Sequence, residues 1–112
     1  MLFCFTGDYT PQALNAMRQH PNADRQAAVK QTIEAAGGKL VAMYGMAVNG
    51  PGVMVTFDVP DPDMAVAISG IAVSTGTLQN VHLTRLFTMD EVNTIRQKRA
   101  KLSEAYKPPG QA

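Results

Sequence analysis

Turn-forming and helix-capping residues divide the chain into short segments, and the order of these segments constrains the fold more than any other feature. Strand-like runs, rich in apolar and β-branched residues, occupy 1–6, 39–48, 53–59 and 77–87. Helical patterns fill the stretches between them, from Thr10 to His20, from Asp24 to Gly37, from Asp61 to Gly76, and from Thr88 onward. The sequence therefore predicts the order β–α–α–β–β–α–β, followed by a terminal helix.

This order is that of a ferredoxin-like α+β sandwich, in which four strands form one antiparallel sheet and the helices cover one face. The run Asn49-Gly50-Pro51-Gly52 is dense in turn formers, so the two middle strands are expected to form an antiparallel hairpin. Thr88 and Glu91 have the spacing of a capping box at the start of the extra C-terminal helix. We expect one domain over residues 1–106 and a disordered tail over 107–112.

Composition and charge narrow the class of protein. The chain has 112 residues, 46% of them hydrophobic and 17% charged, which indicates a globular domain. A net charge of +1 without a basic stripe argues against nucleic acid as a partner. Cys4 is the one cysteine, which excludes an internal disulfide and fits a reducing compartment. Because the N-terminus lacks a signal-peptide pattern and no apolar run reaches about 18 residues, we expect a cytoplasmic protein without a membrane span.

Alternation along the strands predicts two different sheet faces. One set is entirely apolar and includes Phe3, Phe5 and Phe57, so it belongs against the helices, as do Val81, Leu83 and Phe87. The opposite set mixes polar and apolar residues. Its central members are Cys4, Thr6, Met54, Thr56, His82 and Thr84. On the last strand it also includes Leu78 and Asn80. A mixed face that no helix covers typically packs against a second sheet, with a cavity between. We therefore expect a homodimer or a higher homo-oligomer.

Several stretches resemble the GYD-domain family, one of the small families of the dimeric α/β-barrel group. The matching stretches run in order over residues 3–95, and they are FTGDYTPQAL, Arg25 within NADRQAAV, AAGGKLVAMY, FDVPD, AVSTG and TRLFTMDEV. The resemblance implies a ferredoxin-like fold whose sheets pair into a barrel, and it implies little about chemistry. The chain departs from the family at the Gly-Tyr-Asp turn, where Gly50 is followed by Pro51 and Gly52.

His82 and Cys4 are the candidate catalytic residues. An imidazole inside a semi-enclosed barrel titrates near neutral pH and serves as acid, base or ligand; the alternative is a hydrogen-bonded histidine in a dimer interface. Cys4 could act as a thiolate nucleophile if His82 lies close by, whereas a buried free cysteine is usually a small apolar side chain.

The other candidates would line a ligand pocket. Arg25 begins a helix, where a cation opposes the helix dipole, so it either anchors an anionic ligand or pairs with Asp8 or Asp24. Tyr9 and Tyr44 either place a hydroxyl at the pocket mouth or pack amphipathically. The remaining lining residues on the mixed face are Thr6, Thr56 and Thr84.

The sequence lacks the motifs of a metal site and of a phosphate-binding loop. The two histidines, His20 and His82, lie on distant elements without metal-ligand spacing, and Gly37-Gly38 follows a helix instead of preceding one, which rules out a phosphate loop. The sequence specifies no cofactor and leaves enzymatic activity open. The first hypothesis is a homo-oligomeric module that holds a small apolar or aromatic molecule between paired sheets. The second is a non-catalytic scaffold or regulatory subunit that docks through Val92, Ile95 and Leu102; a sensor trimer is a third, disfavoured because no basic nucleotide loop is found.

Overall fold

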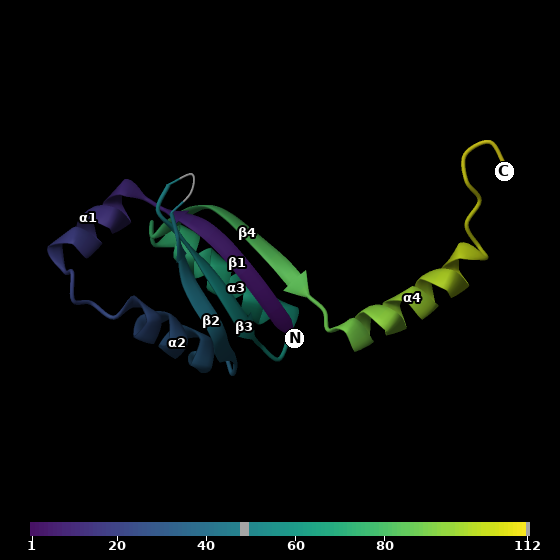
Figure 1. Ribbon diagram of the computed structural model, residues 1–112, viewed down its shortest axis with the longest axis horizontal. Coiled ribbons are helices and arrows are strands. Elements are labelled where there is room, and N and C mark those ends of the chain that lie inside the picture. Colours follow the sequence, from purple (N-terminus) through teal and green to yellow (C-terminus); the bar gives the residue numbers. More distant parts are fainter. Residues whose placement is uncertain (48–49, 112) are drawn as a thin grey trace.

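The computed structural model describes residues 1–47 and 50–111. Its strands and helices follow the predicted order (Figure 1). The strands are β1 (Leu2–Tyr9), β2 (Lys39–Met46), β3 (Gly52–Asp58) and β4 (Leu78–Leu86). The helices are α1 (Pro11–Gln19), α2 (Arg25–Ala35), α3 (Pro62–Ser74) and α4 (Met89–Ser103). The predicted turn residue Asn49 lies outside the described residues, as does the predicted end of the second strand at residue 48.

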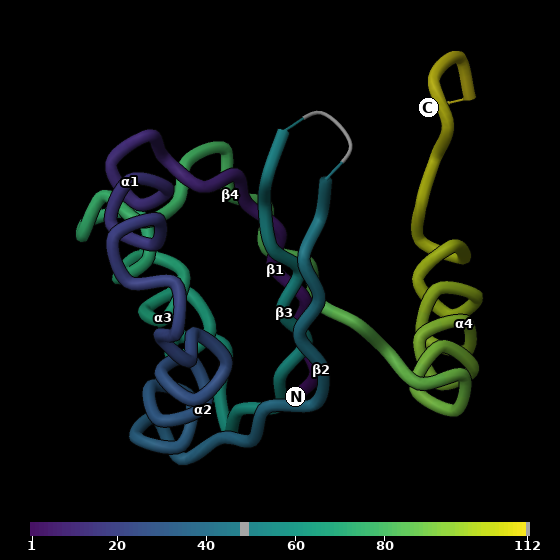
Figure 2. Tube along the Cα trace, turned by 60° about the vertical axis from the view of Figure 1, so that its left-hand side comes forward, coloured from purple at the N-terminus to yellow at the C-terminus, as the bar shows by residue number. Residues whose placement is uncertain are grey.

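The strands form one antiparallel sheet in the order β2-β3-β1-β4. The first and last strands, β1 and β4, are neighbours. The β2–β3 hairpin joins the sheet through β3, which pairs with β1. Helices α1, α2 and α3 all lie on one side of this sheet (Figure 2). The arrangement confirms the predicted α+β, ferredoxin-like fold.

The hydrophobic core lies between the sheet and the helices that cover it. Phe57 is fully buried, and its ring centroid lies 6.1 Å from that of Phe3 and 5.9 Å from that of Phe5. Ile33 of α2 and Ala65 of α3, both fully buried, bring the helices onto this aromatic cluster. The predicted all-apolar face is therefore the packed one.

Two glycines after α2 set the distance between that helix and the sheet. Gly37 has φ +78°, a left-handed conformation that ends the helix, and the Gly38 N–H donates to the carbonyl of Ile33 at 3.0 Å. A Cβ on Gly38 would overlap the backbone carbonyl of Asp58 and approach Val59 Cγ1 to 2.8 Å. The Gly-Gly pair thus ends the helix and allows β2 to start against the end of β3.

A bulge in β4 changes the predicted faces near its start. Asn80 has φ 55°, and the register of β1 with β4 shifts between Thr6 and Asp8. Because of this extra residue, Leu78 turns to the helix side and is buried, so its predicted place on the mixed face is wrong. The Asn80 amide instead donates to the Asp8 carboxylate at 3.3 Å.

Phe87 was predicted to face the helices with Val81 and Leu83, and this is also wrong. It follows the last residue of β4 and is 46% exposed. The guanidinium carbon of Arg85 lies 4.4 Å from the centroid of its ring. Phe87 therefore lies outside the core, at the connection between β4 and α4.

Helix α4 begins with the predicted capping box. The Thr88 hydroxyl accepts from the Glu91 N–H at 3.1 Å, and the Glu91 carboxylate accepts from the Thr88 N–H at 2.9 Å. The hydrogen bond from the Thr88 backbone lowers the pKa of Glu91, as does the Arg85 guanidinium, 3.3 Å from the same carboxylate. These contacts fix the first turn of α4 to the end of β4.

Beyond its first turn, α4 stands apart from the rest of the molecule. It lies on the side of the sheet opposite α1, α2 and α3 (Figure 2). The radius of gyration is 18.3 Å, against about 13 Å for a compact chain of this length. In the part of the chain that the structure describes, no helix is both long and apolar enough to cross a membrane. The division into a domain over 1–106 and a tail over 107–112 stays a prediction, and Ala112 lies outside the described residues.

Candidate functional site

The strand register gathers the mixed residues into one patch, which we call the open face. Cys4 on β1 lies opposite Thr56 on β3 and Thr84 on β4. Thr6, two residues along β1, lies opposite Met54 and His82. Since side chains two residues apart share a face, these six project on the same side. None of the three helices that cover the core lies on this side (Figure 2).

Cys4 and His82 are diagonal neighbours on adjacent strands. Cys4 pairs with Thr84, and His82 lies two residues before Thr84, a relation that puts Cα atoms about 7–8 Å apart in antiparallel sheets. No hydrogen bond joins the two side chains within the described residues, and His82 is exposed whereas Cys4 is half-buried. One chain alone therefore holds the thiol and the imidazole near each other without forming a nucleophile–base pair.

Tyr44 extends the open face toward the β2 edge of the sheet. It lies opposite Met54 in the β2–β3 register and is 62% exposed. The open face thus runs across all four strands and carries hydroxyl, thiol, thioether and imidazole groups.

Tyr9 and Arg25 lie on the other side of the sheet, so the structure divides the predicted pocket residues between two faces. Tyr9 pairs with Leu78 and packs against the core, and Arg25 is the first residue of α2. Burial raises the pKa of the Tyr9 phenol, and the nearby Arg25 guanidinium acts in the opposite direction. Arg25 does not approach His82 or the threonines of the open face.

The predicted ion pair of Arg25 with Asp8 or Asp24 is not formed among residues 1–47 and 50–111. The Asp24 carboxylate caps α2 by accepting from the Ala27 N–H at 2.9 Å, and the Asp8 carboxylate accepts from Asn80. The ion pairs that the structure shows involve other groups. Among residues 1–47 and 50–111, the Arg25 guanidinium thus has no carboxylate partner.

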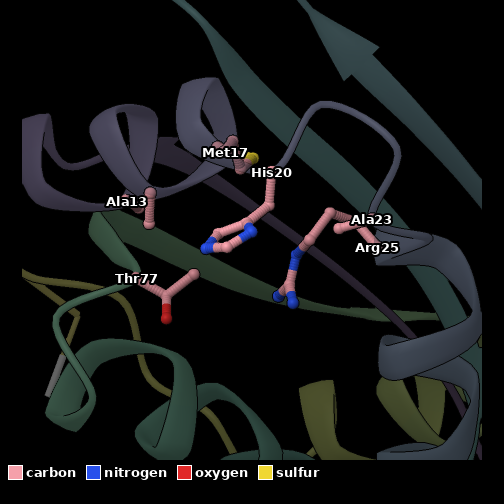
Figure 3. A pocket seen from close by; sticks show the side chains of 7 residues that line it. Ala13, Met17, His20, Ala23, Arg25 and Thr77 are labelled. Atoms are coloured by element: carbon pink, nitrogen blue, oxygen red, sulfur yellow. The ribbon is translucent and has the colours of Figure 1, made fainter.

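Arg25 instead lines a groove on the helix side, between α1, α2 and α3. Two adjoining cavities of about 280 Å³ and about 200 Å³ share Arg25 and Thr77 in their linings. The larger is also lined by Ala13, Ala16, Met17, His20 and Ala23. Figure 3 shows the His20 imidazole and the Arg25 guanidinium projecting into the same space beside Thr77.

His20 was not predicted as a site residue. It directly follows α1, and the short connection from Pro21 to Asp24 turns the chain so that Arg25 comes back beside it. In the sequence, the signal for their proximity was that His20 and Arg25 lie on either side of the helix break at Pro21. Among the described residues, no three His, Cys, Asp or Glu side chains form a cluster that could hold a metal ion.

The chain is similar to a known protein family and to a solved structure. The model of the GYD domain family matches residues 3–95. No curated protein sequence matches the chain significantly. Among solved structures, the chain is similar to 30S ribosomal protein S6 from Thermotoga maritima, with 15% sequence identity and a TM-score of 0.49, over 88% of this chain and 96% of that one.

Proposed function

The chain belongs to the GYD-domain family, and on that premise we propose that it is a homodimer which holds a small, largely apolar molecule between two facing sheets. The observation that carries this proposal is the open face itself. Its side chains are too apolar for a surface that stays in water and too polar for a dry core. A second copy of the same face would enclose them.

The amount of exposed surface supports a second copy. The chain exposes 7855 Å², whereas a compact 12.0 kDa protein exposes about 6,000 Å². The difference, roughly 1,900 Å², exceeds the approximately 800 Å² that each partner buries in a stable interface of standard size. A dimer that covers the open face and α4 would remove this excess.

Helix α4 supplies the apolar part of the proposed interface. Several of its apolar side chains are exposed, among them Met89 at 66% and Leu102 at 72%, and Ile95, Leu102 and Tyr106 line one apolar groove along it. Because α4 lies on the open-face side of the sheet, a copy whose sheet faces this one comes within its reach. We therefore place each α4 against the partner copy.

The chemistry of the enclosed space follows from its lining. Thr6, Thr56 and Thr84 bring hydroxyl groups that donate or accept hydrogen bonds, and Met54 brings an adaptable apolar surface. A few polar groups in an apolar lining suit a small aromatic ligand. In the enclosed space His82 would supply a general acid or base and Cys4 a nucleophile, so catalysis at this site belongs to the same proposal.

Native mass spectrometry of the protein purified from its source tests this function, with His82→Ala as the variant. We expect a dimer that carries a small bound molecule, and we expect His82→Ala to lose that molecule, because the imidazole is removed from the pocket. Gln31→Ala is the control, since Gln31 is exposed on α2 on the other side of the sheet, and it should keep the molecule. A bound molecule that survives in His82→Ala would contradict the proposed pocket.

The second candidate function is a scaffold or regulatory subunit without a ligand. The exposed apolar residues of α4 favour it, because such a helix face can also bind a different protein. A dimer that carries no small molecule, with a mass that His82→Ala leaves unchanged, would support this alternative.

A further inference from the structure

We propose that the groove between α1, α2 and α3 is a separate binding site for a monocarboxylate with an apolar chain, and that Arg25 and His20 hold the carboxylate. This site lies on the helix side of the sheet. It is independent of the pocket proposed on the open face, and neither needs the other.

The shape of the groove fits a long, apolar ligand with one polar end. The two cavities adjoin at Arg25 and Thr77, and the smaller one continues between α2 and α3. Its lining is formed largely by apolar side chains, which are Phe5, Ala28, Val29, Ile68, Ile71 and Ala72. An extended aliphatic chain would bury its surface there, at about 25 cal/mol for each Å² removed from water.

The charge in the groove selects an anion. Arg25 has no carboxylate partner among the described residues, and it stands at the N-terminus of α2, where the helix dipole disfavours a cation. A bound carboxylate would offset the unfavourable interaction of this cation with the helix dipole. The guanidinium presents two parallel N–H donors that match the two oxygens of a carboxylate.

His20 adds a second polar group at the same end of the groove. The His20 imidazole projects toward the space in front of the Arg25 guanidinium (Figure 3), so its N–H can donate to the same anion. The other polar side chains of the lining are Thr32, Thr75 and Thr77, and the first two donate their hydroxyls to backbone carbonyls of Ala28 and Ile71. Arg25, His20 and Thr77 are left to hold the ligand's polar end, which suits a monocarboxylate.

Titration of the isotope-labelled protein with octanoate, followed by amide chemical shifts, tests this site. We expect shifts at residues 13–25 and at Thr77, and an affinity that Arg25→Gln lowers about tenfold or more, as for the loss of a charge-assisted hydrogen bond. Arg18→Gln is the matched control, because Arg18 donates to the Asn15 side chain at 2.7 Å and does not line the groove. Its affinity for octanoate should equal that of the wild type.

Binding of a neutral probe distinguishes the contribution of the Arg25 charge to affinity from that of the apolar lining. Binding of 1-octanol should be weaker than that of octanoate and unchanged by Arg25→Gln. The proposal is overturned if the wild type does not bind octanoate, if Arg25→Gln binds it as well as the wild type, or if Arg18→Gln loses as much affinity. Shifts confined to Cys4, Thr6 and His82 would also overturn it, since octanoate would then occupy the open face.

Discussion

Thr56→Arg should convert the proposed dimer into a monomer. Thr56 is half-buried on β3, at the centre of the open face, between Cys4 of β1 and Ala42 of β2 in the sheet register. In a face-to-face dimer each copy would contribute one buried guanidinium without a carboxylate partner. Burying an unpaired charge costs several kcal/mol even after relaxation, which is a large part of the free energy of most dimer interfaces. Sedimentation of the purified variant at micromolar concentration would measure the loss.

Two matched variants separate this effect from misfolding and from charge alone. Thr56→Val keeps the size and shape of the side chain and should stay dimeric. Gln31→Arg places the same charge on the exposed face of α2, which the proposed interface does not use, and should stay dimeric too. A folded Thr56→Arg protein, with a far-ultraviolet dichroism spectrum equal to that of the wild type, that still sediments as a dimer would contradict pairing through the open face.

Phe57→Ala should cause the largest loss of folding stability. Phe57 is fully buried, packs against Phe3 and Phe5, and lies on the strand that joins the β2–β3 hairpin to the rest of the sheet. Truncation of a buried phenylalanine removes apolar burial and leaves a cavity, at a cost of about 3–5 kcal/mol. Because a domain of this size is stable by about 5–15 kcal/mol, a sizeable fraction of the variant is expected to unfold at modest urea concentrations.

Urea unfolding at one fixed protein concentration would measure this loss, because the stability of a dimer depends on concentration. Val66→Ala is the control: it shortens an apolar side chain that is 60% exposed on α3, and its effect should stay within about 0.5 kcal/mol. Similar urea midpoints for the two variants would show that the aromatic cluster is not the centre of the core.

Local signals made most of the fold predictable from the sequence. Thr10, Asp24, Asp61 and Thr88 each cap a helix at the predicted place, and the Gly37-Gly38 pair ends α2 as predicted. These signals depend on a few neighbouring residues and on backbone conformation, so they can be read without knowledge of the tertiary structure. The alternation of Phe3 and Phe5 with Cys4 and Thr6 likewise specified the two faces of β1.

Features that depend on distant contacts were not predictable. The bulge at Asn80 arises where Leu78 and Val81 both pack near Gly7, and a strict alternation therefore assigned Leu78 to the wrong face. Sequence reasoning also placed Tyr9 and Arg25 in one pocket with His82. Their separation follows from where α2 returns along the sheet, which no short pattern contains, and the proximity of His20 to Arg25 has the same origin.

The central claim is that two copies of the open face meet, and the molar mass of the wild-type protein in solution tests it most directly. Sedimentation equilibrium over a range of protein concentrations gives that mass without reference to shape, which matters for a molecule 62 Å long. We predict a mass twice the 12.0 kDa of one chain, retained on dilution to low micromolar concentration. A mass of 12.0 kDa at all concentrations would contradict the proposal, because the open face and α4 would then remain in water.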